Sequence, residues 1–138
     1  MYLHILLATD LLETCVIPAR QARDIATQMN ARLSIVHVLE PITTFGFPIV
    51  TDTGIEAMKH AKKTLSKLGD ELAVAKNDQH IRTGSPKHEI VELALEISAD
   101  LIVAGSEGRF GLSQLLGSTG LGLIHGSKCD VLIVKPPK

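Results

Sequence analysis

Short, unbroken apolar runs alternate along the chain with longer segments of helical pattern. Mostly apolar runs occupy residues 3–9, 32–39, 101–104 and 130–135. Runs of this length without alternation are typical of strands buried on both faces of a parallel sheet. A further run, residues 79–83, is more polar, as expected of a strand at a sheet edge. These five runs are the predicted strands.

The segments between the strands carry apolar residues at helical spacing. In residues 13–30 the small residues Ala19, Ala22 and Ala26 recur on one face, and Pro18 predicts that the regular helix begins near it. Residues 55–72 form the clearest helix, and its apolar stripe consists of Ile55, Met58, Ala61, Leu65, Leu68 and Leu72. Residues 87–98 follow an N-cap and proline at positions 85 and 86. The inner face of this helix is expected to carry Ile90, Val91, Ala94, Leu95 and Ile97. Residues 119–125 predict a short last helix, and residues 40–53 predict a loop.

Strands that alternate with helices predict one α/β domain over residues 1–138. The expected architecture is an open five-stranded parallel sheet with right-handed crossovers and helices on both faces. Ligands of such sheets lie beyond the carboxyl ends of the strands. The sequence therefore places a candidate site at Ala8, Thr9 and Asp10, at Val38, and in residues 105–119.

Composition narrows the function classes. Hydrophobic residues make up 45% of the 138 residues, and the formal net charge of -1 offers no overall attraction to nucleic acid or anionic lipid. No apolar run approaches the roughly 18 residues of a membrane span. Cys15 and Cys129 form no CxxC pair, and no basic region precedes the first apolar run. We expect reduced thiols, a cytoplasmic location, and neither nucleic-acid nor membrane partners.

A glycine-rich stretch follows the fourth strand. It contains Gly105, Gly108 and Gly117, and it ends at Ser118 and Thr119, which open the last predicted helix. Backbone N–H groups at such a place can hold an anion, and Arg109 would add a charged contact. The alternative is that these glycines only make turns. There is no GxxxxGK[ST], G-x-S-x-G or HExxH motif in the sequence.

The segments ILLATD, LSIVHV, TGSPKHEIVELA, DLIVAGSEGRFGLSQLLGST and CDVLIVKPP together resemble the universal stress protein family, of the universal stress protein A type. The resemblance covers nearly the whole chain. It implies a Rossmann-like sheet of order 3-2-1-4-5, similar to the adenine nucleotide alpha hydrolases. It also implies a homodimer formed by the last strand, through Val131, Leu132, Ile133 and Val134.

One branch of that family binds ATP through the pattern G-x-x-G-x9-G-S/T. Gly105, Gly108, Gly117 and Ser118 match its residue types, but eight residues separate Gly108 from Gly117. The shorter spacing resembles the branch that does not bind ATP, although that branch generally lacks these glycines. The resemblance thus implies ATP or another adenine nucleotide as a ligand, with Mg²⁺ as a companion ion, and leaves non-binding open.

Individual residues keep two interpretations each. Asp10 could accept a ribose hydroxyl or lie near a metal, or it could cap the following segment. Val38 and Ala8 could form a wall for adenine or belong to the core. His37, in the second predicted strand, is expected to be a hydrogen-bonded structural residue and not a ligand. Glu107 could hold a metal ion, or it could oppose a triphosphate and favour AMP. Gly122, like Gly120, suits close backbone approach or a loose helix.

We therefore expect a cytoplasmic, homodimeric stress-response protein that binds an adenine nucleotide with little or no turnover. The alternative is a dimeric interaction protein without nucleotide. An enzyme that hydrolyses ATP or phosphorylates itself at Ser118 or Thr119 ranks last, because the sequence positions no general base.

Overall fold

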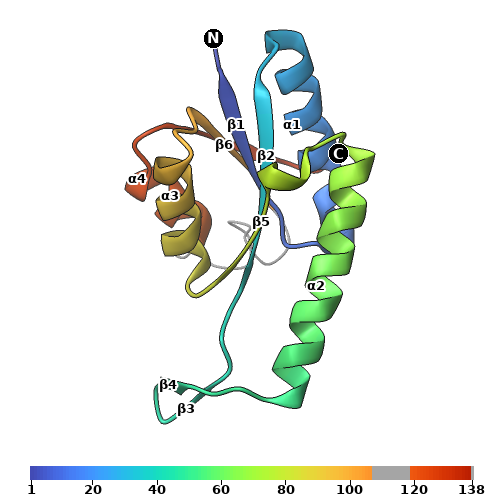
Figure 1. The fold of residues 1–138 in the computed structure, drawn as a ribbon. Helices are drawn as coiled ribbons and strands as arrows, with labels where there is room; N and C mark the ends of the chain where they lie inside the picture. Colours follow the sequence, from blue (N-terminus) through green and yellow to red (C-terminus); the bar gives the residue numbers. More distant parts are fainter. Residues whose placement is uncertain (107–118, 138) are drawn as a thin grey trace.

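The computed structural model describes residues 1–106 and 119–137. Five parallel strands form one sheet in the order β5-β2-β1-β6-β7 (Figure 1). This is the predicted 3-2-1-4-5 order. The strands are β1 (His4–Ala8), β2 (Arg32–Leu39), β5 (Gln79–Thr83), β6 (Leu101–Gly105) and β7 (Asp130–Val134).

Two helices lie on each face of the sheet, as predicted. A 3-10 turn, η1 (Glu13–Cys15), leads into α1, and Pro18 is the third residue of that helix, where it breaks no hydrogen bond. Helices α1 and α2 cover one face, and α3 and α4 cover the other. Their bounds are α1 (Val16–Met29), α2 (Asp52–Glu71), α3 (Pro86–Glu96) and α4 (Thr119–Gly126); a second 3-10 turn, η2 (Lys76–Asp78), precedes β5.

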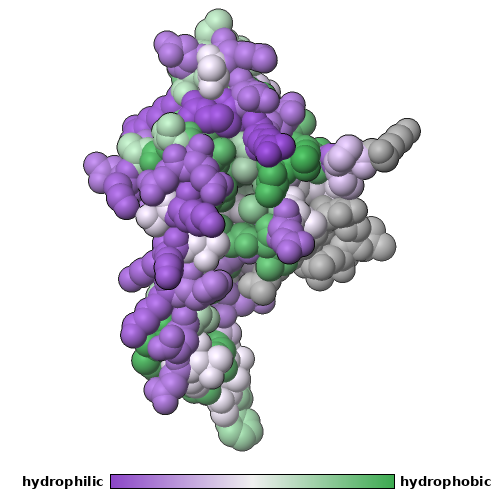
Figure 2. All heavy atoms as spheres, turned by 90° about the vertical axis from the view of Figure 1, so that its right-hand side faces the viewer, coloured by the Kyte–Doolittle hydropathy of each residue, from purple (hydrophilic) through white to green (hydrophobic). Residues whose placement is uncertain are grey.

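Helix α2 extends past the end of the sheet (Figure 1). It begins at Asp52, earlier than predicted, because the Thr51 hydroxyl accepts a 2.9 Å hydrogen bond from the Gly54 amide and caps the first turn. Its outer surface is largely hydrophilic (Figure 2). Ile55 was predicted to join the buried stripe and is exposed, since no strand of the main sheet covers this end of the helix. In the second half, Ala61 and Leu65 are buried as predicted.

The prediction of a plain loop over residues 40–53 is wrong, because this segment contains a β-hairpin. Strands β3 (Thr43–Thr44) and β4 (Phe47–Pro48) pair antiparallel, and the Ile49 amide extends the ladder to the Ile42 carbonyl at 2.9 Å. Both turn residues, Phe45 and Gly46, have positive φ, as a two-residue hairpin turn of type I′ requires. The glycine adopts this conformation freely, whereas Phe45 is strained.

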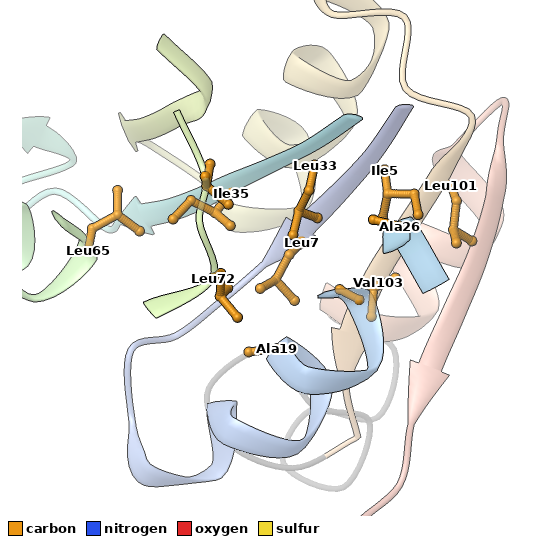
Figure 3. Close-up of a cluster of buried hydrophobic side chains, with 12 residues drawn as sticks. Ile5, Leu7, Ala19, Ala26, Leu33, Ile35, Leu65, Leu72, Leu101 and Val103 are labelled. Carbon is orange, nitrogen blue, oxygen red and sulfur yellow. The ribbon is translucent and has the colours of Figure 1, made fainter. Parts of the chain in front are cut away.

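Alternate residues of the central strands face opposite helices, which divides the core in two. In β1, Ile5 and Leu7 face α1 and α2 (Figure 3), and Leu6 and Ala8 face α3 and α4. The small residues Ala19, Ala22 and Ala26 are buried where α1 meets the sheet, as predicted, and they allow close approach. Truncating a fully buried residue such as Ile35 to alanine would cost about 2–5 kcal/mol.

Helix α3 differs from the prediction in which residues face inward. Ile90 and Ala94 are buried as expected, but Leu93 is buried in place of Leu95, which is half exposed. The helix therefore turns a different edge of its apolar side to the sheet. Ser85 occupies the predicted N-cap position without a side-chain cap, and Pro86 is the first helical residue.

Candidate functional site

The turn after β1 is polar, buried and held by its own side chains. The Thr9 amide donates to the Val36 carbonyl at 2.9 Å, and the Thr9 hydroxyl accepts from the Leu11 amide at 3.0 Å. Asp10 accepts from the Leu12 amide at 2.9 Å and is only 8% exposed. This bond closes a local turn and does not cap η1, whose N-cap position is held by Leu12 without a side-chain cap. It fixes the carboxylate where β1 ends.

A histidine ties this turn to the neighbouring strand. The ring nitrogen Nδ1 of His37 in β2 lies 2.8 Å from the Thr9 carbonyl oxygen, so Nδ1 carries the proton and donates it. His37 is 4% exposed. The sequence-based prediction of a hydrogen-bonded structural histidine is confirmed, and the bond sets the position of the Thr9 backbone.

Around these residues lies a small recess, here called the strand-end recess. It is lined by Ala8, Thr9 and Asp10 from the end of β1, by Thr14, Cys15 and Pro18 from the start of α1, and by Gly105 from β6. It encloses about 10 Å³, close to the least that one water molecule needs. A neighbouring hollow of about 70 Å³ shares Thr14 and Gly105 with the recess and extends to Ser106 and Val134.

The recess lies where the direction of the chain through the sheet reverses. From β1 the chain moves to β2 and β5 on one side, and then crosses to β6 and β7 on the other. The crevice between β1 and β6 is the place where open α/β sheets bind ligands. Of the residues predicted from sequence, the structure brings Ala8, Thr9, Asp10 and Gly105 together here.

Val38 lies apart from the recess. It is fully buried in the core that faces α3 and α4, so its side chain presents no surface in this structure. This agrees with the core role that the sequence left open. Ala8 shares that core and also lines the recess.

Several predicted site residues lie outside the described part of the chain: Glu107, Gly108, Arg109, Gly117 and Ser118. Thr119, also predicted, is the first residue of α4. In the same helix, a Cβ on Gly122 would stand 2.4 Å from Cδ of Lys87. A side chain at Gly122 would therefore require the flexible Lys87 side chain to move.

Sequence reasoning missed Thr14 and Cys15. Burial raises the pKa of the Cys15 thiol, and a hydrogen bond with Thr9 opposes that rise only in part. The thiol is therefore protonated at neutral pH and serves as a wall of the recess. Their place in the sequence, between the end of β1 and Pro18, could have identified both residues. The short segment between β1 and α1 must turn back over the carboxyl ends of the strands, and it brings these residues to the recess.

Residues 1–135 match the model of the universal stress protein family. The chain belongs to the universal stress protein family. The resemblance seen in the sequence is thus confirmed. Among curated relatives, universal stress protein A homolog 1 of Coxiella burnetii is 37% identical over 138 residues, which cover 96% of each chain. Universal stress protein A homolog 2 of the same organism is 32% identical, over 83% of this chain and 82% of its own.

A solved structure shares both fold and sequence similarity with this universal stress protein. It is a universal stress protein in complex with cAMP, 28% identical, with a TM-score of 0.72 and 97% of both chains covered. Over residues 1–106 and 119–137, no three His, Cys, Asp or Glu side chains gather closely enough to hold a metal ion. Nor is any described helix both long and apolar enough to cross a membrane.

Proposed function

We propose that this universal stress protein binds an adenine nucleotide across the mouth of the strand-end recess, with little or no turnover. The observation that carries the proposal is the placement of the buried Asp10 carboxylate beside Gly105 in the crevice between β1 and β6. Support comes from the relative in complex with cAMP, which shares 28% of its sequence with this chain. ATP, ADP, AMP and cAMP are the candidate ligands.

In this proposal each described residue of the recess has a role. The recess is too small for a nucleotide, so the ligand lies over it and the Asp10 carboxylate faces a ribose hydroxyl from below. The bond from Leu12 occupies one carboxylate oxygen, which orients the side chain. Gly105 has no side chain to obstruct the sugar or the phosphates. We further propose that the phosphates are contacted by Gly108, Arg109, Gly117, Ser118 and Thr119. The negative charge of Glu107 would disfavour ATP, the most highly charged of the candidate ligands.

Isothermal titration calorimetry with the four nucleotides tests this proposal. We expect saturable binding of one nucleotide per chain, weakened about tenfold by Asp10→Ala, which corresponds to one lost hydrogen bond to a charged group. Asp10→Asn keeps an acceptor and should lose less. Asp24→Ala, on the exposed side of α1, is the matched control. The absence of heat with every nucleotide at millimolar concentration would overturn the proposal.

Homodimerisation in the cytoplasm is part of the same proposal. Strand β7 ends the sheet, and its apolar residues Val131, Leu132, Ile133 and Val134 are only half buried. An apolar edge strand invites pairing with a second copy. Both cysteines are free, as expected of a reducing compartment.

A dimeric interaction protein without nucleotide is the second candidate. The small volume of the strand-end recess favours it, as does the exposed apolar hairpin β3–β4, in which Phe45 is 97% exposed. The same titrations distinguish the two candidates, because the second predicts no nucleotide binding and an unchanged dimer.

A further inference from the structure

A second and much larger hollow lies away from the strand-end recess. It encloses about 590 Å³, and we call it the hairpin hollow. Its walls are the hairpin segment (residues 40–50), the first half of α2, and the carboxyl ends of β2 and β5. Its volume is in the range of small-molecule sites, about 300–1,000 Å³. Asp10 and Gly105 do not line it. It is therefore separate from the proposed nucleotide site.

The wall of the hairpin hollow is mainly apolar. Ile42, Pro48 and Ile49 come from the hairpin segment, and Ile55 and Met58 come from α2. Ile42, Ile49 and Ile55 are each more than two-fifths exposed. Figure 2 shows apolar side chains beside hydrophilic ones at the lower end of the molecule, where the hairpin and the start of α2 lie. Exposed apolar side chains gathered around one hollow are typical of a binding site.

Two lysines of α2 also line the hollow. Lys59 and Lys62 are exposed at their heads, and their aliphatic stems can lie along the apolar wall. The Nζ atom of Lys59 lies 3.9 Å from a carboxylate oxygen of Glu56. This exposed ion pair is weak, so Glu56 competes only weakly with a bound anion for the ammonium group. One carboxylate, Glu40, lines the hollow as well, so these three side chains sum to one positive charge.

We propose that the hairpin hollow binds a small amphipathic anion, with its unbranched apolar tail against the isoleucines and its anionic head between Lys59 and Lys62. The tail would cover side chains that water now hydrates, which is the main driving force. The lysine pair selects the head group by charge. This site lies outside the proposed nucleotide function and does not depend on it.

The hairpin tip of a second copy would be a different occupant, since Phe45 and Phe47 are strongly exposed. Charge argues against it. The hairpin tip, residues 43–48, carries no carboxylate that could pair with Lys59 and Lys62. Inserting the tip would therefore leave both ammonium groups beside an apolar surface without a counter-charge, which is unfavourable.

Calorimetric titration of the full chain with dodecanoate below its micelle concentration tests the proposal. Dodecyltrimethylammonium and dodecanol have the same tail with a cationic and a neutral head. We expect one dodecanoate per chain, weaker binding of dodecanol, and little binding of the cation. Asp10→Ala should bind dodecanoate like the wild type, which separates this result from the nucleotide proposal.

A matched pair of charge reversals locates the site. Lys59→Glu/Lys62→Glu should weaken dodecanoate binding about tenfold or more. Lys63→Glu/Lys67→Glu changes the same net charge on the same exposed helix, away from the hollow, and should bind like the wild type. Circular dichroism verifies that both variants are folded. Equal weakening in both pairs, tighter binding of the cation, or no saturable binding would overturn the proposal. So would wild-type self-association that Phe45→Ser/Phe47→Ser abolishes.

Discussion

The imidazole Nδ1 of His37 donates a 2.8 Å hydrogen bond to the Thr9 carbonyl, which joins β2 to the turn that carries Asp10. Both residues are almost fully buried. The carbonyl therefore has little access to water if the histidine is removed. This bond makes the position of the proposed nucleotide contact depend on a side chain that does not itself line the strand-end recess.

Replacing His37 should therefore affect both stability and binding. We expect His37→Phe, which keeps an aromatic ring but removes the donor, to lower the free energy of unfolding by about 1–3 kcal/mol. Nucleotide affinity should fall with it, because the Thr9 backbone is released. Urea denaturation and calorimetry measure the two effects. His60→Phe, at an exposed position of α2, is the control. An unchanged urea midpoint in His37→Phe would show that the bond contributes nothing.

The rate at which the Cys15 thiol is alkylated should show whether a ligand covers the strand-end recess. Its thiol lies in the wall beside Asp10, whereas Cys129 lies next to the last strand on the other side of the core. Burial raises the pKa of both thiols, so alkylation at neutral pH should be slow at each. Saturating AMP should slow iodoacetamide labelling of Cys15 further and leave Cys129 unchanged, as followed by mass spectrometry. Equal labelling rates with and without nucleotide would place the ligand elsewhere.

The stability of the fold should depend on pH through His80 in β5. Burial lowers the pKa of His80, and the positive charge of Arg82 lowers it further, as does His4. The negative charges of Asp78 and Glu96 raise this pKa but do not outweigh the burial. Its Nε2 is buried without a hydrogen-bond partner in the described part of the chain. Folding therefore favours the neutral ring.

The sign follows from linkage. The unfolded chain binds this proton near pH 6.5, whereas the folded chain binds it only at lower pH. Stability due to neutral His80 is thus present above about pH 6.5 and is lost as pH falls toward the folded pKa. His80→Gln should remove this loss, so its stability relative to the wild type should rise from about pH 7.5 to pH 5.5 in urea titrations. A constant difference for His80→Gln would contradict the assignment.

The apolar edge of β7 predicts the oligomeric state. Leu132→Arg should convert a dimer into a monomer in light scattering after size exclusion, because a charge would be buried between the paired edges. Ile124→Arg places the same side chain on an exposed position of α4 and should leave the dimer intact. A monomeric wild type at roughly 100 µM, in the range expected for a weak homodimer, would refute the edge pairing.

The strands could be predicted because parallel strands buried on both faces are continuous apolar runs. Their order in the sheet followed from the resemblance to the universal stress protein family. Residues 32–39 and 79–83 have the predicted bounds. The hairpin β3–β4 was missed because each of its strands has two residues, too few to show alternation, although Gly46 marks its turn. The exposure of Ile55 was missed because a helical stripe says nothing about how far the neighbouring sheet extends.

The site was predictable in part, for a related reason. Gly105 ends β6 and Asp10 lies two residues after β1, so topology places them at one edge of the sheet. Thr14 and Cys15 reach the same edge only through the path of the turn after β1, which local patterns do not encode. The bond from His37 to Thr9 joins residues 28 positions apart and depends on the register between β1 and β2.

The most direct test of the nucleotide proposal is a crystal structure of the full chain grown with AMP, and in parallel with ATP and Mg²⁺. The proposal predicts a nucleotide over the strand-end recess, with a ribose hydroxyl at hydrogen-bond distance from the Asp10 carboxylate and phosphates toward the start of α4. A nucleotide bound elsewhere, or an empty crevice between β1 and β6 at saturating concentration, would contradict it.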